Sequence, residues 1–326
     1  MTATKPSRKM QPKSISHGRP PTVSRPAASL SAKATRTLIR SHHQLHKARA
    51  QALVAGDEAL VKRLDQQIAA NGGLESYQLA SKKGQSIERG GDSSKVLVEW
   101  LDLDLRSLKN KGVQQQQQTG STDNKLRLLE VGALSTQNAC SKVGVLDVTR
   151  IDLNSQEKGI LQQDFMERPL PTTSAERFHI ISLSLVLNYV SDPAWRGEML
   201  RRTVSFLEHA IPLPAPAPAS PGSETAAHPL LPCLFLVLPA ACVLNSRYFT
   251  EERLADIMAT LGYTMQRRKV TSKLIFYLWS HNDDGEETSR SQPRVFRKDM
   301  LNPGATRNNF TVTLGSSKKM DIGAVG

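Results

Sequence analysis

Several features that mark membrane, secreted and metal-binding proteins are scarce or missing in this sequence of 326 residues. No apolar run reaches the roughly 18 residues that a membrane-spanning helix needs. The longest run, 230–244, is interrupted by Pro232 and Pro239. The first 30 residues contain no apolar segment typical of a signal peptide. The three cysteines include no Cys-x-x-Cys pair, which argues against a disulfide scaffold or a cysteine zinc site. We therefore expect no membrane partner, no secretory leader and no bound metal.

Aromatic residues are few, and acidic residues are absent from the first part of the chain. Aromatics make up 5% of the chain and the wider apolar set 39%, below the usual ~45–50%, a range that also counts Gly. Residues 1–49 hold 11 Lys and Arg and no Asp or Glu, whereas residues 96–280 hold 19 basic and 18 acidic side chains. A basic arm on a nearly neutral body is typical of a protein that binds a polyanion, although a solvated tail without a ligand has the same composition.

The two ends of the chain differ in composition from its middle. Residues 1–30 are rich in Pro, Ser, Lys and Arg and are predicted to form a disordered basic tail. Residues 31–95 are predicted to form a basic helical hairpin and a linker, because apolar residues recur at helical spacing on both sides of Gly56. Residues 281–326 are polar and aperiodic, so we expect a flexible C-terminal tail with at most one strand, near Val312.

Residues 96–280 alternate apolar runs with helical patterns and contain two loop insertions, a Gln-rich one at 112–124 and a Pro- and Ala-rich one at 211–232. The predicted strands are 126–132, 146–153, 160–165, 178–190, 233–239 and 269–280, and the helical patterns lie at 95–108, 195–210 and 250–261. Continuous apolar runs are typical of strands buried on both faces. We therefore predict a doubly wound α/β fold, with helices on both sides of a parallel or mixed sheet.

Two residues near strand ends indicate a nucleoside cofactor. Gly132 ends the first strand, without the further glycines of a GxGxxG motif. Asp152 follows it by 20 residues, the spacing at which an acidic side chain accepts hydrogen bonds from a ribose diol. Each residue also has a simpler explanation, a turn glycine and a capping or turn aspartate. The missing glycines argue against a bound pyrophosphate, so the pair favours S-adenosylmethionine over NAD.

The ends of the third and fourth predicted strands add further candidates. Asp164 is placed to contact an adenine amino group with Phe165 against the ring, or the two are a polar strand end and a core aromatic. Asn188 and Tyr189 are placed to orient and stack an acceptor base, or they are a capping amide and a packed ring. We take Asn188 as the candidate catalytic residue, and Asp164 and Phe165 as candidate cofactor residues beside Gly132 and Asp152.

Eight segments carry a resemblance to a known family. They are RGGDSSKVLVEWL (89–101), LLEVGALS (128–135), VTRIDLNS (148–155), QQDFMERPLP (162–171), ISLSLVLNYV (181–190), RGEMLRR (196–202), LFLVLP (234–239) and NSRY (245–248). Over about 75–280 the chain resembles the fungal 25S ribosomal RNA adenine-N(1)-methyltransferase family. The resemblance implies a Rossmann-like class I methyltransferase sheet with flanking helices, preceded here by the basic helical segment. By motif match, Gly132 and Asp152 take the family's cofactor-binding positions.

The resemblance also implies a substrate and a location. The expected activity is S-adenosylmethionine-dependent methylation of adenine N1 in large-subunit ribosomal RNA, on free RNA or a pre-ribosome, by a monomer in the nucleolus of the nucleus. Adenine N1 is itself a nucleophile, so the enzyme has to unpair the base and hold it about 3–3.5 Å from the methyl group. Animal relatives of the family look like S-adenosylmethionine sensors of the TOR pathway, and a non-catalytic sensor is the alternative. A vestigial ribosome-assembly factor is a third interpretation.

Overall fold

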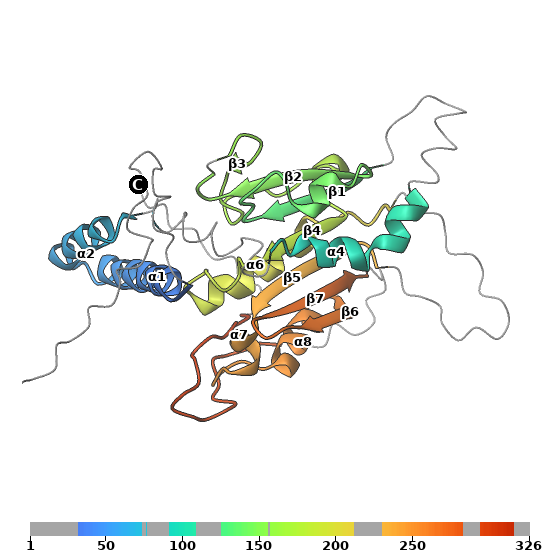
Figure 1. Ribbon diagram of the computed structural model, residues 1–326. Coiled ribbons are helices and arrows are strands. Elements are labelled where there is room, and N and C mark those ends of the chain that lie inside the picture. The colour runs from blue at the N-terminus through green and yellow to red at the C-terminus, as the bar shows by residue number, and fades with distance from the viewer. Residues whose placement is uncertain are drawn as a thin grey trace, which may run out of the picture.

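The computed structural model describes residues 32–73, 76, 91–108, 125–155, 157–211, 230–282 and 294–315 (Figure 1). The predicted basic tail at 1–30, the Gln-rich insertion at 112–124 and nearly all of the linker and of the second insertion lie outside these described residues. The described residues form a helical hairpin, one mixed sheet with helices on both faces, and a C-terminal segment that packs on the sheet domain.

Seven strands form one sheet in the order β3-β2-β1-β4-β5-β7-β6. Their bounds are β1 Leu126–Val131, β2 Leu146–Asp152, β3 Leu161–Gln162, β4 Ile180–Ser184, β5 Cys233–Pro239, β6 Tyr263–Val270 and β7 Leu274–His281. Strands β1 to β5 run parallel, and β7 is antiparallel to both β5 and β6. The strand order reverses between β1 and β4, and the crevice at the carboxyl ends of such a switch point is where open α/β sheets bind ligands.

Helices cover both faces of the sheet, as predicted. On one face, α4 (Ser94–Trp100) and the helical residues that follow it to 108 pack against β1, β4 and β5. On the other face lie α6 (Pro193–Ser205), α8 (Glu251–Thr260) and the short α7 (Ala240–Leu244). The side chains of β5 alternate between the two cores, and all those from 233 to 238 are fully buried. A strand buried on both faces therefore reads as one continuous apolar run.

Two predicted strands are shorter than their apolar runs suggest. The run 178–190 contains β4 only up to Ser184, because Leu185 adopts a φ of +58° and turns the chain out of the sheet. The apolar residues beyond it, including Val186 and Leu187, pack in the loop that follows. The run 160–165 contains the two-residue β3, since the chain turns away at Asp164.

The last predicted strand, 269–280, contains nearly all of β7 but misses the strand before it. The structure has a hairpin there, with β6 and β7 joined at Thr271–Lys273, and β6 ends where the predicted strand begins. Much of β6 is exposed and its second half carries Arg267, Arg268 and Lys269. Charged side chains are common on edge strands, where they discourage further strand pairing, and they hide the strand from a search for apolar runs.

The predicted flexible tail is corrected for residues 294–315, which we call the C-terminal strap. Phe296, Phe310, Val312 and Leu314 of the strap are buried and belong to the hydrophobic core beside α6 and α8. The strap has no regular strand, only an isolated antiparallel bridge between Phe296 and Leu314. Phe310, Val312 and Leu314 do alternate with threonines, as the strand expected near Val312 requires, but residues 294–309 show no apolar period, which is why the sequence reads as an uncovered tail.

The N-terminal hairpin is formed by α1 (Ala32–Val54) and α2 (Glu58–Ala70), which pack mainly on each other. Asp57 caps α2 by accepting a hydrogen bond from the backbone N–H of Leu60 at 2.9 Å. An ion pair between Arg49 and Asp65, 2.5 Å apart, joins the helices. Among the helices of the described residues, none combines the length and the apolar character that crossing a membrane requires.

Candidate functional site

The predicted pair Gly132 and Asp152 lies together at the carboxyl edge of the sheet. Strands β1 and β2 pair in parallel with Val131 opposite Ile151. The backbone N–H groups of Gly132 and Ala133 both donate to the carbonyl of Ile151, at 2.8 and 3.1 Å. The parallel register therefore brings the turn after β1 beside the acidic end of β2, as the sequence spacing predicts.

Gly132 occupies a position that no other residue fits without strain. Its φ is +74°, and a Cβ built on it would lie 2.6 Å from Cγ2 of Val186. Val186 belongs to the turn after β4, so the chains leaving β1 and β4 approach each other closely at the switch point. Leu185, next to it, is a non-glycine residue at a positive φ, and such strain clusters at binding sites.

The carboxylate of Asp152 stabilises a turn with one oxygen and leaves its other oxygen available as an acceptor. Its Oδ1 accepts a hydrogen bond from the backbone N–H of Asn154 at 2.8 Å, and Oδ2 has no partner among the described residues. Burial raises the pKa of Asp152, and the hydrogen bond from Asn154 partly offsets that rise. The turn role and the ribose-binding role are therefore compatible.

Asp164 and Phe165 lie in different surroundings, one in a turn and the other in the core. Oδ1 of Asp164 accepts a hydrogen bond from the backbone N–H of Met166 at 2.7 Å, in the turn that follows β3. The ring of Phe165 is 2% exposed and lies 5.4 Å from the ring of Phe206. This packing favours the core role for Phe165 over contact with an adenine ring, while the role of Asp164 in cofactor binding stays a prediction.

Asn188 carries an unsatisfied buried acceptor. Its Oδ1 is buried and has no hydrogen-bond partner among the described residues. The neighbouring helix α6 is capped instead by Asp192, which accepts from the backbone N–H of Ala194 at 2.6 Å. The capping explanation for Asn188 is therefore wrong. Leaving a buried acceptor unpaired costs about 1–3 kcal/mol, so this atom calls for a donor from outside the described residues.

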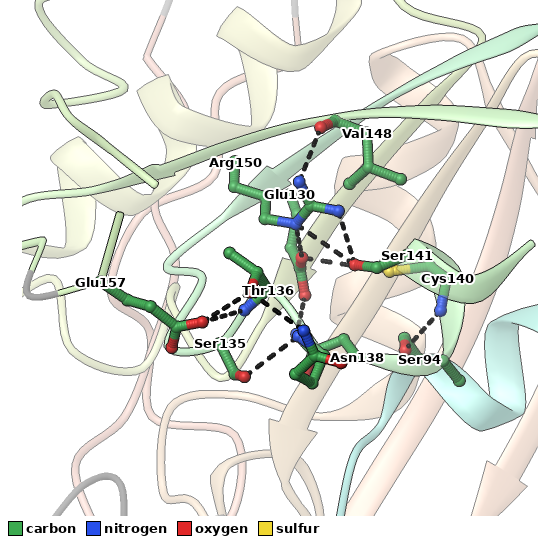
Figure 2. Close-up of polar contacts among 12 residues, drawn as sticks. Ser94, Glu130, Ser135, Thr136, Asn138, Cys140, Ser141, Val148, Arg150 and Glu157 are labelled. Atoms are coloured by element: carbon green, nitrogen blue, oxygen red, sulfur yellow. Dashed lines mark hydrogen bonds and ion pairs between the residues drawn. The ribbon is translucent and has the colours of Figure 1, made fainter. Parts of the chain in front are cut away.

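A buried polar network that sequence reasoning missed holds the loop after β1. Figure 2 shows Glu130, Asn138 and Arg150 pointing toward one another. Nδ2 of Asn138 donates to Oε1 of Glu130 at 2.6 Å, and Nε of Arg150 lies 4.0 Å from Oε2 of Glu130. Burial raises the pKa of Glu130 to about 7, although the Asn138 hydrogen bond and the Arg150 charge oppose the rise. Glu130 thus fixes the loop from within the sheet.

A second tie joins the loops after β1 and β2. Oε1 of Glu157 accepts from the backbone N–H of Thr136 at 2.9 Å and from its hydroxyl at 2.6 Å (Figure 2). Gly159, in the same loop, has a φ of +96° and packs so closely that a Cβ would lie 3.2 Å from Cγ2 of Thr136. The two loops that border Gly132 and Asp152 are thus bound to each other.

The segment before α4 is hydrogen-bonded to the loop after β1 and to the end of β4. Asp92 accepts hydrogen bonds from the backbone N–H and hydroxyl of Ser94 at 2.8 and 2.7 Å, and from the backbone N–H of Ala139 at 2.5 Å. The hydroxyl of Ser93 lies 2.7 Å from that of Ser184, at the end of β4. The RGGDSSK segment gives a partial signal, because an aspartate just before a predicted helix is a candidate helix cap. Nothing in the segment indicates the bond from Ala139.

Sheet order and the switch point between β1 and β4 define a doubly wound, Rossmann-like α/β fold, and the predicted fold class is confirmed. Fold alone does not fix the reaction, because such folds carry many activities. In the described residues, no group of three or more His, Cys, Asp and Glu side chains is arranged to hold a metal ion.

The chain belongs to the family described as 25S rRNA (adenine(2142)-N(1))-methyltransferase, Bmt2, whose model matches residues 62–312. A 25S rRNA adenine-N(1) methyltransferase of Schizosaccharomyces pombe is 35% identical over 285 residues, covering 84% of this chain and 89% of that protein. A 25S rRNA (adenine(2142)-N(1))-methyltransferase of Saccharomyces cerevisiae is 35% identical over 250 residues, or 76% of this chain and 62% of that protein. The resemblance found in the sequence is confirmed.

Solved structures include more distant likenesses. One is the O-methyltransferase NcsB1 of neocarzinostatin biosynthesis, solved in complex with S-adenosylmethionine and a naphthoic acid. It has a TM-score of 0.37 and 11% sequence identity, and the match covers 76% of this chain and 71% of that one.

Proposed function

We propose that this protein is an S-adenosylmethionine-dependent methyltransferase that methylates N1 of an adenine in 25S ribosomal RNA. The observation that carries the proposal is family membership over residues 62–312, in a family and with relatives whose names state this reaction. The carboxyl ends of β1 and β4, where folds of this type bind ligands, suit this reaction, since the segments Leu128–Ser135 and Ile181–Val190 lie there.

The residues present fit a nucleoside cofactor. Gly132 adds no side chain of its own at the sheet edge. The second carboxylate oxygen of Asp152 has no partner among the described residues and can accept from a ribose hydroxyl. S-adenosylmethionine, when bound, supplies an electrophilic methyl group. The loops at 133–138 and 153–159, tied to each other through Glu157, border the same edge and keep its shape.

On the acceptor side the chain has to orient a base rather than remove a proton. Adenine N1 attacks with its own lone pair, so the residues need only hold the ring and exclude water. Oδ1 of Asn188 is a buried acceptor that suits the N6 amino group of an adenine. The ring of Tyr189, 36% exposed, lies next to it in the chain and can stack on a base that has left its duplex.

The decisive experiment measures methyl transfer. The purified protein is incubated with tritiated S-adenosylmethionine and with 25S rRNA from cells that lack the protein, and the modified nucleoside is identified by mass spectrometry. We expect N1-methyladenine at one position. If rRNA from cells lacking the protein keeps N1-methyladenine at full level, the proposal is wrong.

We also propose that the protein works as a monomer in the nucleolus. The support is the 25S rRNA substrate named for its relatives, together with the strongly basic N-terminal arm. Sedimentation of the purified chain and imaging of the tagged protein in cells test the two statements. A stable dimer would contradict the first, and exclusion from the nucleolus would contradict the second.

A further inference from the structure

The C-terminal strap is pinned to the loop that follows β4. The guanidinium of buried Arg196 donates to the carbonyl of Val190 at 2.7 Å and to that of Thr311 at 2.6 Å, and it lies 4.4 Å from the Phe310 ring. A Cβ on Gly197 would lie 1.9 Å from the carbonyl oxygen of Thr313, so the strap runs directly over the start of α6. The RGEMLRR segment therefore holds the strap beside the turn that contains Asn188.

The strap is also pinned to the loop that follows β5. Nδ2 of Asn308 donates to the carbonyls of Ala241 and Asn245 at 2.6 and 2.8 Å, at the two ends of α7. The hydroxyl of Ser246 donates to the carbonyl of Phe310 at 2.5 Å. Because α7 begins at the residue after β5, the strap lies at the carboxyl ends of both β4 and β5 (Figure 1).

This position is on the acceptor half of the crevice. The cofactor candidates Gly132, Asp152 and Asp164 follow β1, β2 and β3, on one side of the switch point. The half that remains open to an acceptor follows β4 and β5, where Asn188 lies. An RNA strand that places an adenine at Asn188 therefore has to run close to the strap.

Two neighbouring cations of the strap have no carboxylate partner among the residues that the structure describes. Among the charged side chains of the strap, Arg294 pairs with Asp256 of α8 at 3.5 Å, and Asp299 pairs with Arg253. Arg297 and Lys298 are exposed and have no carboxylate partner among the described residues. Nζ of Lys298 lies 4.7 Å from the ring centre of Tyr248, a partly buried aromatic under the same segment.

We propose that Arg297 and Lys298 bind backbone phosphates of the RNA that flanks the target adenine, which makes the strap an RNA-docking surface. The proposal rests on the proposed function, because it needs an RNA acceptor. Exposed Arg and Lys side chains suit phosphates, whose contacts fix the register of a bound strand without reading its sequence. Buried Phe296, its bridge to Leu314 and the pair between Asp299 and Arg253 hold these cations in a fixed place. Cations on a loose tail would instead leave the register of the RNA unset.

The test compares two charge reversals of equal size in the full-length protein. The strap variant is R297E/K298E, and the control is K125E/R177E, which changes two exposed cations just before β1 and near the start of β4, at the opposite edge of the sheet. Binding of a 25S rRNA fragment is measured over a range of salt concentrations, and S-adenosylmethionine affinity is measured by calorimetry. A milder variant, R297Q/K298Q, removes the charges without reversing them.

We expect the strap variant to bind RNA at least about tenfold more weakly near physiological salt, with the control within about threefold of wild type. The plot of log affinity against log salt becomes shallower by about 0.7–0.9 for each phosphate interaction that is removed, and R297Q/K298Q shows the same change of slope. Cofactor affinity stays unchanged in all variants, which shows that they fold. Equal losses in strap and control variants, or no loss in the strap variant, would overturn the proposal. A wild-type protein that binds rRNA but transfers no methyl group would instead count against the proposed function.

Discussion

At the scale of single residues, the carboxyl edge of the sheet contains one position that only glycine fits without strain. The φ of Gly132 is +74°, and a Cβ there would lie 2.6 Å from Val186. A left-handed backbone costs a residue with a Cβ about 1–2 kcal/mol before any clash is counted.

The first prediction concerns Gly132→Arg. We expect S-adenosylmethionine affinity to fall at least about tenfold, because the side chain fills the crevice and its charge repels the sulfonium. Calorimetry measures the affinity, and circular dichroism checks folding. Gly144→Arg is the matched control, since Gly144 has no atom within 4 Å of a built Cβ and no left-handed φ. Unchanged affinity in Gly132→Arg would show that the cofactor site is elsewhere.

The second prediction concerns Asn188→Ala, which removes the unpaired buried acceptor. If Oδ1 of Asn188 accepts from the adenine amino group, methyl transfer slows by about tenfold or more, in line with the 1–3 kcal/mol of a buried hydrogen bond. Cofactor affinity stays close to that of the wild type. Asn188→Asp keeps an acceptor oxygen and should retain more activity than the alanine variant. Single-turnover methyl transfer to rRNA compares the wild type with both variants. Equal rates would show that Asn188 does not bind the acceptor adenine.

The third prediction follows from the buried carboxyl of Glu130. Its pKa of about 7 in the folded protein exceeds the ordinary value of 4.5, so the folded state binds the proton more tightly than the unfolded state. The contribution of Glu130 to stability is therefore highest below about pH 4.5 and falls as the pH rises through about 7. Glu130→Gln removes this loss while keeping an acceptor for Asn138. Urea unfolding is measured at about pH 5 and about pH 8, on either side of the folded-state pKa. From the lower to the higher pH, the free energy of unfolding should fall more in the wild type than in the variant. Parallel changes would contradict the assignment.

At the scale of elements, the sequence predicts best where burial is two-sided. The bounds of β5, Cys233–Pro239, follow from its sequence because alternate side chains fill two cores and none is polar up to 238. Strand β6 escapes the same search, since its edge position exposes Arg267 to Val270. The first part of the C-terminal strap is missed too, because buried Phe296 lies 14 residues before Phe310 with no apolar period between them.

The candidate site likewise has residues that the sequence predicts and residues that it does not. Gly132 and Asp152 could be predicted because adjacent parallel strands convert a sequence spacing into a spatial one. Asp92 could not, because its bond to Ala139 joins segments 47 residues apart, and no spacing rule connects a loop before a helix to a loop after a strand. Glu130 reads as an ordinary strand-end acid until Asn138 and Arg150 are seen around it.

The fourth prediction concerns the hydrogen bonds that Asp92 accepts from Ser94 and Ala139. In Asp92→Ala the backbone N–H of Ala139 and both donors of Ser94 lose their acceptor. We expect the loop after β1 to loosen and cofactor affinity to fall about tenfold, as each broken bond costs about 0.5–1.5 kcal/mol. Asp102→Ala is the control, because it breaks only an exposed pair with Arg106, of a type worth at most about 0.5 kcal/mol. If calorimetry finds equal affinities in the two variants, Asp92 has no role in shaping the site.

At the scale of the whole molecule, charge and chemistry are separated along the chain. Residues 1–73 hold 13 Lys and Arg against 3 Asp and Glu, whereas residues 96–280 are nearly neutral. The described part of the basic segment is the α1–α2 hairpin, whose helices pack mainly on each other. This arrangement suits a division in which the arm supplies RNA affinity and the sheet domain supplies the cofactor crevice.

The fifth prediction is that a truncated chain beginning at Leu74 keeps its cofactor affinity and loses RNA affinity. Gly132, Asp152 and the loops tied to them lie wholly in the retained part, so calorimetry should give the wild-type value for S-adenosylmethionine. Each phosphate interaction that is removed with the arm makes the salt dependence of RNA binding shallower by about 0.7–0.9. The effect adds to that of R297E/K298E if the hairpin and the strap bind separate phosphates. If the truncated chain binds rRNA with the full affinity and the full salt slope, the basic arm does not contribute to RNA binding.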